Sequence, residues 1–487
     1  MNINNQVQLI TYPDSLGGDL KTLYDVLQKY FDDIFKGGIH ILPPFPSSGD
    51  RGFAPLTYLE IEPKFGTWED IRKLGKKYDI MLDLMVNHIS KESIYFQDFL
   101  KHGRKSKYAD MFITIDKIWA DNKPVKEEIE KIFLRRTEPF SNYTIEGTGK
   151  VETVWTSFGK ATPSEQIDLD VNSIKAREIL TNFLTNFSNN NIKMVRLDAV
   201  GYVIKKRSTS CFFVEPEIYQ FLNWLTELAH SLNIKILPEV HAQHLTQEKL
   251  ADKGYWIYDF ILPYMILEAF IAKNSARLSG YLKTRPAKQF TMLDCHDGIP
   301  IIPDLNDLVN TKDLRKIVDV CVERGGNLSL IFSPKFKYAD GFDVHQIRGT
   351  YYSLLDCNDD AYIAARAIQF FTPGIPQVYY VGLLAGENDL ESIKGSIDGR
   401  EINRHNFNMD EIGKEVQKPV VKRLLRLIRF RNEYPAFNGK FEVLNSDEKT
   451  LNLKWEKGES MCRLNVNFEN NRSIIEYMDG KKILKFL

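Results

Sequence analysis

Three acidic residues and one arginine stand where short apolar runs should end as strands. Arg196 and Asp198 lie in KMVRLDAVGY (193–202), Glu239 follows ILP, and Asp297 follows LDCH. Because side chains in a strand alternate between faces, Arg196 and Asp198 share one face. Two charges on one buried face imply that they pair with each other or serve something outside the strand. The two readings are a structural ion pair and an ionised nucleophile held by its electrostatic partner.

Further polar residues follow the same pattern. Asn87 and His88 close another apolar run, and His296 precedes Asp297. Each of these residues alone is more often a helix cap or part of an ion pair. Several acidic residues close together repel one another and destabilise a fold, so their presence at the ends of several strands predicts an active site there. Three carboxylates with two histidines and an arginine suit glycosidic-bond chemistry. In that chemistry one carboxylate attacks the anomeric carbon and a second protonates the leaving oxygen.

Eight apolar, β-rich runs alternate with segments of helical spacing. Near-continuous apolar strands between helices indicate a parallel sheet covered on its outer face, and eight of them predict an α/β fold, the (β/α)8 TIM barrel. A doubly wound open sheet is the alternative, although no GxGxxG sequence follows the first run. The runs begin at Val7, Gly37, Asp79, Lys193, Ile234, Tyr258, Phe290 and Gly374.

Three long stretches of the chain do not follow the alternation of strands and helices, and they predict additional domains. We expect the barrel to comprise residues 1–88 and 171–434, with a separate domain inserted at 89–170. A second insertion, about 299–355, precedes the eighth strand. The tail, 435–487, alternates polar and apolar residues between turn residues, which predicts a C-terminal antiparallel β-sheet domain.

The composition excludes several classes of function. The chain has 64 basic and 65 acidic residues, a formal net charge of -1, so no global field draws it to nucleic acid or to an anionic membrane. The N-terminal segment lacks a basic region followed by an apolar core, and the five cysteines lack CxxC spacing. We therefore expect a cytoplasmic protein with reduced thiols that acts on small molecules. The composition does not distinguish a monomer from a homodimer.

Four motifs carry a resemblance to a known family. DLMVNH, RLDAVGY, LPEVH and LDCHDG resemble, in order and spacing, the strand-end motifs of the alpha-amylase superfamily. The resemblance implies that Asp198 is the nucleophile, Glu239 the general acid/base and Asp297 a third acid that binds sugar hydroxyls. It also implies sugar-binding and orienting roles for His88, His296 and Arg196, and it makes the insert at 89–170 that family's domain B.

Other segments resemble one branch of this superfamily, the sucrose phosphorylases: PFPSSGDRGFAPLTY, EQIDLDV, TSCFFVEPEIY, PGIPQVYYVGLLAGENDL and GREINRH. The branch implies that Asp50 and Arg400 clamp the far hydroxyls of glucose. Phe53 and Gln166 match an aromatic platform and a polar contact, with a packed phenylalanine and a loop amide as the alternatives. The branch implies neither a metal nor a cofactor.

A retaining mechanism leaves a glucosyl ester on the nucleophile, and the group that removes it decides the activity. Phosphate requires cationic or hydrogen-bonding groups beside the intermediate. Two segments supply candidates, although a basic loop is usually a solvated surface. They are Arg135 and Arg136 in KIFLRRTEPF, and Lys335, Lys337, His345 and Gln346 in SPKFKYADGFDVHQIRG.

This second segment departs from the branch. Its members commonly carry a tyrosine where this chain has His345, and a histidine can donate two hydrogen bonds and carry a positive charge. Added cations suit a phosphorylated fructose, so the hypothesis is a phosphorylase that cleaves sucrose 6'-phosphate. The alternatives are a phosphorylase preferring sucrose, a sucrose hydrolase, or a non-catalytic carbohydrate-binding scaffold.

Overall fold

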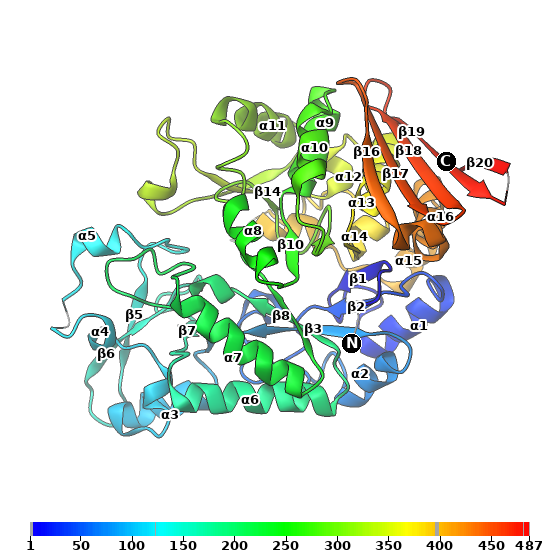
Figure 1. Cartoon of the computed structure of the whole chain (residues 1–487). Helices are drawn as coiled ribbons and strands as arrows, with labels where there is room; N and C mark the ends of the chain where they lie inside the picture. The colour runs from blue at the N-terminus through cyan, green and yellow to red at the C-terminus, as the bar shows by residue number, and fades with distance from the viewer. Residues whose placement is uncertain (1–2, 122, 395–398, 481, 487) are drawn as a thin grey trace. The chain divides into compact units, whose positions relative to one another are not determined.

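The computed structural model describes residues 3–121, 123–394, 399–480 and 482–486 (Figure 1). The chain groups into two compact units. The first comprises Met1–His40, His241–Leu330 and Val344–Leu487, and the second Ile41–Val240 and Ile331–Asp343. The domain boundaries expected near residues 88, 170 and 434 stay predictions.

All eight predicted strands are present. They follow one another in a parallel sheet in the order β10-β11-β15-β1-β2-β3-β8-β9, which confirms the predicted α/β class and its barrel-type strand succession. Their bounds are β1 (Gln8–Thr11), β2 (Gly38–Ile41), β3 (Ile80–Met85), β8 (Met194–Asp198), β9 (Lys235–Pro238), β10 (Ile257–Asp259), β11 (Gln289–Thr291) and β15 (Ile375–Tyr379).

Strands β3, β8 and β9 form the sheet core of the second unit, and their register decides which side chains meet. Asp83 pairs with Arg196, and Met85 pairs with Asp198. Arg196 in turn lies beside Leu237 of β9. Because parallel strands in register bring their ends to one edge, the ends of β8 and β9 place Asp198 and Glu239 close together.

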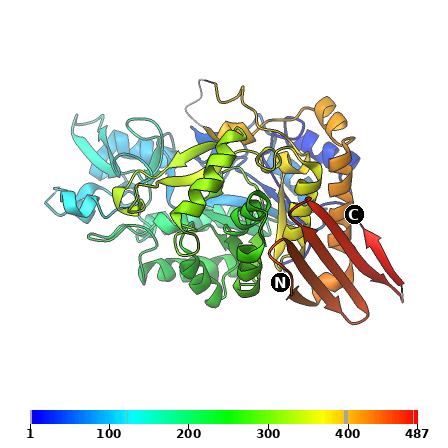
Figure 2. The same ribbon diagram turned by 90° about the horizontal axis from the view of Figure 1, so that it is seen from above.

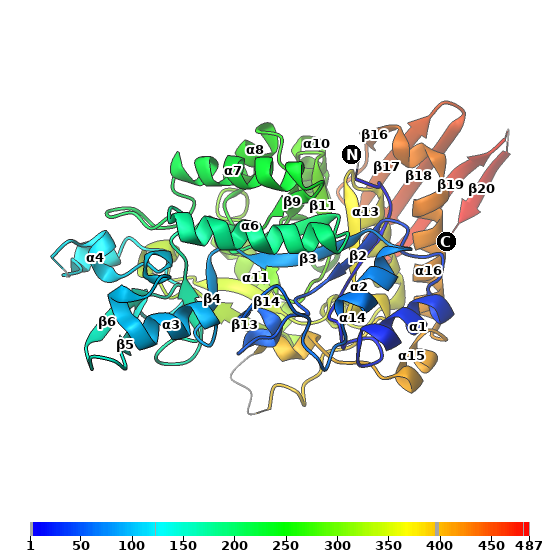
Figure 3. The same ribbon diagram turned by 90° about the horizontal axis from the view of Figure 1, so that it is seen from below.

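Helices cover these strands because their apolar faces must be buried. Ser173 caps α6 (Ile174–Asn189), and Phe183 of that helix packs on Tyr58 with ring centroids 4.8 Å apart. Figures 1 and 3 show α6 side by side with α7 (Glu217–Ser231). The other helices of this unit are α2 (Trp68–Gly75), α3 (Ile94–His102), α4 (Ile115–Ile118) and α5 (Lys126–Ile129).

The insert after β3 contains two antiparallel ladders. Strand β4 (His88–Ser90) pairs with β7 (Gln166–Asp168), and β5 (Phe140–Thr144) pairs with β6 (Val151–Trp155).

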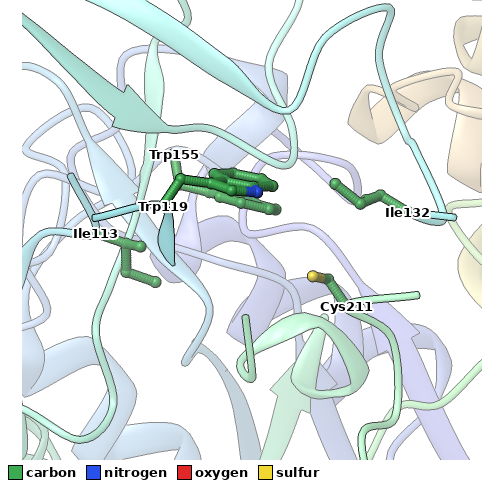
Figure 4. Close-up of a cluster of buried hydrophobic side chains, with 5 residues drawn as sticks. All are labelled: Ile113, Trp119, Ile132, Trp155 and Cys211. Atoms are coloured by element: carbon green, nitrogen blue, oxygen red, sulfur yellow. The ribbon is translucent and has the colours of Figure 1, made fainter. Parts of the chain in front are cut away.

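A buried cluster ties the insert to the loop that follows β8. Trp119 and Trp155 stack with ring centroids 5.9 Å apart, and Ile113, Ile132 and Cys211 complete the cluster (Figure 4). Cys211 comes from that loop, so burial of these apolar side chains holds the loop against the insert.

The first unit carries the second insertion as a three-stranded antiparallel sheet. Its order is β12-β14-β13, with bounds β12 (Ile299–Pro300), β13 (Asn327–Leu330) and β14 (Val344–Arg348). The helices of this unit are α1 (Leu20–Tyr30), α8 (His244–Asp252), α9 (Leu262–Ala272), α10 (Ala276–Thr284), α11 (Thr311–Glu323), α12 (Tyr351–Leu354), α13 (Asp359–Phe371), α14 (Tyr380–Leu383), α15 (Met409–Glu415) and α16 (Pro419–Glu433).

The tail forms the predicted antiparallel sheet. Five strands follow in sequence order, β16 (Lys440–Leu444), β17 (Thr450–Lys457), β18 (Ser460–Asn467), β19 (Arg472–Asp479) and β20 (Lys482–Phe486). Leu451, Leu453 and Trp455 are buried and alternate with half-buried positions. Figure 2 shows α16, in orange, alongside these red strands, where Phe430 packs on Tyr477.

Candidate active site

Arg196 is the centre of the polar group at the ends of β8 and β9. Its guanidinium donates to Asp198 Oδ1 at 3.0 Å and to Asp83 Oδ1 at 2.5 Å, and its Nη2 lies 3.0 Å from Glu239 Oε1. The side chain of Arg196 is 4% exposed and that of Asp83 is 0% exposed, whereas Asp198 is 13% exposed. One buried cation therefore joins three carboxylates, and two of them are the predicted catalytic acids.

Glu239 is held at both of its carboxylate oxygens. Oε1 contacts Arg196, and Oε2 accepts from the backbone N–H of Ala199 at 3.0 Å. Ala199 has φ 53° and ψ 25°, a left-handed conformation that costs a residue with a Cβ about 1 kcal/mol or more. This conformation directs the N–H that follows the nucleophile candidate toward the acid/base candidate.

Phe53 and His88 form a second group in the same unit. The Arg196 guanidinium lies 5.9 Å from the centroid of the Phe53 ring, and the Phe53 carbonyl contacts His88 Nε2 at 2.9 Å. Burial lowers the pKa of His88, an effect that the nearby Asp168 carboxylate opposes. A neutral imidazole suits a sugar hydroxyl, because it has one donor and one acceptor nitrogen.

Asp50 and Gln166 lie on elements next to this group. Asp50 is half-buried and, like Arg51, has φ 49°, so two successive non-glycine residues are left-handed just before Phe53. Gln166 is buried on β7, where it pairs with Ser90 of β4. The clamp expected between Asp50 and Arg400 stays a prediction.

A buried lysine neutralises the carboxylate behind His88. Lys205 Nζ lies 2.6 Å from Asp168 Oδ2 and donates to Asn87 Oδ1 at 2.7 Å, and the side chains of Lys205 and Asp168 are 1% and 0% exposed. Asp168 also accepts from the Ser157 N–H at 2.8 Å. Among the residues that the structure describes, no group of three or more His, Cys, Asp and Glu side chains is arranged to hold a metal ion.

The two arginines of the insert differ in what they contact. Arg136 donates to the carbonyls of Phe158 and Ala161, at 3.2 and 3.1 Å, so it braces a loop. Arg135 instead donates to the Tyr202 hydroxyl at 3.4 Å and lies 5.9 Å from the Phe158 ring. Phe158 packs 5.4 Å from His88, so the ring that Arg135 contacts lies beside one of the sugar-binding candidates.

Segment 331–343 is bound to the same part of the insert. The Leu134 N–H donates to Ser333 Oγ at 2.7 Å, and Phe133 packs on Phe336 at 4.4 Å. Of the two predicted lysines, Lys337 forms an ion pair with Asp343 at 2.7 Å, and Lys335 is exposed.

In the first unit, Asp297 lies among cationic side chains. Arg400 Nη1 donates to Asp297 Oδ1 at 3.1 Å, and Arg404 Nη2 is 3.8 Å from the same oxygen. Arg404 Nε donates to the His296 carbonyl at 2.9 Å, and His296 Nε2 lies 3.6 Å from Asp297 Oδ2. The predicted residues His296, Asp297 and Arg400 are thus brought together.

His345 and Gln346 are both buried on β14. The Nδ1 of His345 contacts the Ile302 carbonyl at 2.5 Å. The predicted phosphate-binding histidine is therefore an internal side chain of this sheet, oriented by the preceding insertion loop.

Sequence reasoning missed Asp83, Lys205 and Arg404. Asp83 carried a signal, since it is a lone charge inside the apolar run DIMLDLMVNH. Lys205 and Arg404 lie in polar loops, and their partners are fixed only by the fold.

The comparisons with known proteins agree on the kind of protein. Residues 3–261 match the alpha amylase catalytic domain. The chain is 64% identical to a sucrose 6(F)-phosphate phosphorylase of Thermoanaerobacterium thermosaccharolyticum, covering 98% of each chain. It is 41% identical to a sucrose phosphorylase of Streptococcus mutans, covering 96% of this chain and 97% of the other.

Solved structures give the same result. A crystal structure of sucrose 6F-phosphate phosphorylase from Thermoanaerobacter thermosaccharolyticum aligns with a TM-score of 0.99 and 62% identity, covering 100% of this chain and 99% of the other. An alpha-amylase from H. orenii aligns with a TM-score of 0.68 at 15% identity, covering 100% and 97%, and shares the fold. Within the described residues, no helix has the length and apolar character needed to cross a membrane.

Proposed function

The chain belongs to the alpha-amylase family, and from this premise we propose that it is a phosphorylase of sucrose 6'-phosphate. It transfers the glucosyl group to inorganic phosphate, giving α-glucose 1-phosphate and fructose 6-phosphate. Sucrose is a second donor, giving fructose. The observation that carries the proposal is the contact of one buried guanidinium, that of Arg196, with both Asp198 and Glu239.

The first half-reaction breaks the glycosidic bond. A carboxylate oxygen of Asp198 attacks the anomeric carbon while Glu239 gives its proton to the departing fructosyl oxygen, leaving a glucosyl ester on Asp198. Arg196 stabilises the ionised form of Asp198 through its hydrogen bond. Its single positive charge does not balance three carboxylates, which favours retention of a proton on one of them.

The second half-reaction regenerates the enzyme. A phosphate oxygen attacks the anomeric carbon of the ester, Glu239 takes the proton that phosphate releases, and Asp198 leaves as a carboxylate. Two inversions at the same carbon retain its α configuration. Water in place of phosphate makes the same cycle a hydrolysis.

We assign the remaining roles by the family resemblance. Asp297 is the third acid, held by Arg400 and Arg404. The glucose-binding residues are Asp50, Phe53, His88, Gln166, Arg196, His296 and Arg400. The phosphate-binding residues are Arg135, Arg136, His345, Gln346, Lys335 and Lys337. Among these, the contacts of Arg135 with Tyr202 and Phe158 favour it over Arg136.

The preference for the 6'-phosphate over plain sucrose rests on two observations. The relative that is 64% identical carries the phosphorylated substrate in its name, whereas the sucrose phosphorylase is 41% identical. His345 and Arg135 add basic groups that a neutral fructose does not require. A cytoplasmic location is part of the proposal, since all five cysteines are free thiols.

The test is release of glucose 1-phosphate, in phosphate buffer, from sucrose 6'-phosphate and from sucrose at matched low concentrations. A higher kcat/KM for the phosphorylated donor supports the proposal. Higher kcat/KM for sucrose makes the protein a sucrose phosphorylase. Glucose without glucose 1-phosphate makes it a hydrolase, and no turnover of either donor leaves a carbohydrate-binding scaffold.

A further inference from the structure

A second histidine lies next to His345 in the first unit and has no part in the proposed mechanism. The ring centroids of His241 and His345 are 6.4 Å apart, with an interplanar angle of 70°. Hydrogen bonds from nitrogen to a phosphate oxygen span about 2.7 to 3.2 Å, so two imidazoles at this separation can donate to different oxygens of one phosphate group.

The same nitrogen of both rings faces one short segment, 302–304. His345 Nδ1 contacts the Ile302 carbonyl at 2.5 Å, and His241 Nδ1 lies 3.4 Å from Asp304 Oδ1. A carbonyl can only accept, so Nδ1 of His345 carries its proton there. The Asp304 carboxylate likewise favours a proton on Nδ1 of His241.

This tautomer makes each ring a selective partner for an anion. With Nδ1 protonated, the opposite nitrogen, Nε2, can donate only when the imidazole is cationic. A phosphate monoester only accepts at its anionic oxygens, so its binding favours the charged form of both rings. A neutral sugar hydroxyl exerts no such demand, since it donates as well as accepts.

The surroundings of His241 favour its charged form. Asp304 is fully buried, and a carboxylate in a poorly solvated place stabilises a neighbouring cation more strongly than one in water does. Phe260 stacks on the His241 ring with centroids 3.9 Å apart, which fixes the ring plane and suits a cationic imidazole. Gln247 donates to Asp304 Oδ1 at 3.3 Å and holds the carboxylate in position.

The geometry points to His241 as a second phosphate-recognition residue beside His345, with Asp304 as its positioning residue. Together they recognise the phosphate monoester of a phosphorylated fructosyl group, in the donor or in the fructose 6-phosphate product. This inference rests on the proposed function, which it deepens by naming a residue that selects the phosphorylated substrate.

The experiment compares kcat/KM for glucose 1-phosphate release from sucrose 6'-phosphate and from sucrose in four proteins. They are the wild type, His241→Gln, Asp304→Asn and the double variant. His241→Gln should lower the ratio of the two kcat/KM values about tenfold or more, as expected for loss of one charge-assisted hydrogen bond. Asp304→Asn should lower the ratio less, and the double variant should not fall below His241→Gln, since Asp304 acts through His241.

A matched control comes from the same region. His244 is buried on α8 and pairs with Glu248 at 3.3 Å, so His244→Gln removes a comparable imidazole that has no proposed contact with phosphate. That variant should leave the ratio unchanged. An equal fold-loss on both donors in His241→Gln would overturn the inference, and so would independent, additive effects of His241→Gln and Asp304→Asn.

A binding measurement separates this inference from catalysis. Fructose 6-phosphate and fructose are titrated calorimetrically into each protein, and His241→Gln should weaken only the phosphorylated sugar. Unchanged binding of fructose 6-phosphate would overturn the inference. If His241→Gln does not fold, Asp304→Asn, which changes charge and little volume, carries the same two tests.

The proposed function fails separately, when wild-type protein releases glucose 1-phosphate from neither donor. If the wild type is active but the variants keep its ratio of kcat/KM for the two donors, only the proposed role of His241 is refuted.

Discussion

Asp83 and Arg196 stand opposite each other in the neighbouring strands β3 and β8, and Arg196 Nη1 donates to Asp83 Oδ1. The same guanidinium reaches Asp198 and Glu239. Asp83 therefore anchors the cation from inside the sheet, while the two more exposed carboxylates lie at its outer end. The buried ion pair of Asp83 and Arg196 thus also orients the candidate nucleophile and the candidate acid/base.

Asp83→Asn tests this anchoring role. The change weakens the hydrogen bond that holds Arg196 from inside the sheet, while Asp198 and Glu239 still compensate its charge. We expect the free energy of unfolding to fall by about 1 to 3 kcal/mol in urea titrations, the cost of a weakened buried hydrogen bond, and kcat/KM to fall because Arg196 is less well held. Asp33→Asn is the control: Asp33 pairs with Arg429 at the surface, and its loss should cost less than about 1 kcal/mol. Wild-type stability and turnover in Asp83→Asn would contradict the anchoring role.

Part of this site could be predicted from the sequence because it depends on local patterns. The alternation of side chains in KMVRLDAV predicts that Arg196 and Asp198 share a face, and their contact is present. The eight apolar runs likewise predicted the parallel strands, since burial of both faces leaves a continuous apolar signal.

The missed residues depend on relationships between distant segments. Asp83 meets Arg196 across 113 positions of the chain, and only the register of β3 against β8 decides that pairing. Lys205 meets Asp168 from a loop, and the fold of the insert determines its partner. A one-residue change in register would alter every such contact while leaving the local patterns intact.

The catalytic assignments make separate predictions for Asp198 and Glu239. Asp198→Ala should lower kcat by about 10⁴-fold or more, because no ester can form. Glu239→Gln should lose turnover of sucrose 6'-phosphate, yet keep more activity on a glucosyl donor whose leaving group needs no proton. Both are measured as glucose 1-phosphate release, with thermal melting to confirm folding. Near-wild-type turnover by Asp198→Ala would refute its assignment as nucleophile.

Stability should depend on pH through His88. Burial lowers the pKa of His88 in the folded protein, so below the unfolded value of about 6.5 the unfolded state binds more protons there. Its contribution to stability is therefore complete above about pH 6.5 and is lost as the pH falls through and below that value. His88→Gln should make the loss of stability between pH 8 and pH 5 smaller than in the wild type, as measured by urea unfolding at each pH. Parallel curves for the two proteins would mean that His88 does not contribute to the pH dependence.

Lys205→Met should destabilise the second unit. The side chain of Lys205 is almost fully buried against Asp168, and its removal leaves a buried carboxylate without its ion-pair partner, a loss of about 3 to 5 kcal/mol. Replacing Asp168 with Asn in the same protein should restore part of that stability, because the uncompensated charge is then removed. Urea unfolding of the two single variants and the double variant measures this coupling, and purely additive losses would show that the pair is not coupled.

Arg135 and Arg136 offer a matched pair for the role of the insert in phosphate recognition. Arg136 donates to two loop carbonyls, whereas Arg135 donates to the Tyr202 hydroxyl and lies near the Phe158 ring. Arg135→Gln should therefore lower kcat/KM for the phosphorylated donor by about 10- to 100-fold, the effect of removing a charge-assisted hydrogen bond, with a smaller loss on sucrose. Arg136→Gln should change the donor ratio little and lower the melting temperature instead, because it releases the loop. The opposite result, with donor selectivity lost in Arg136→Gln and kept in Arg135→Gln, would mean that the loop rearranges when substrate binds and that Arg136 is the phosphate ligand.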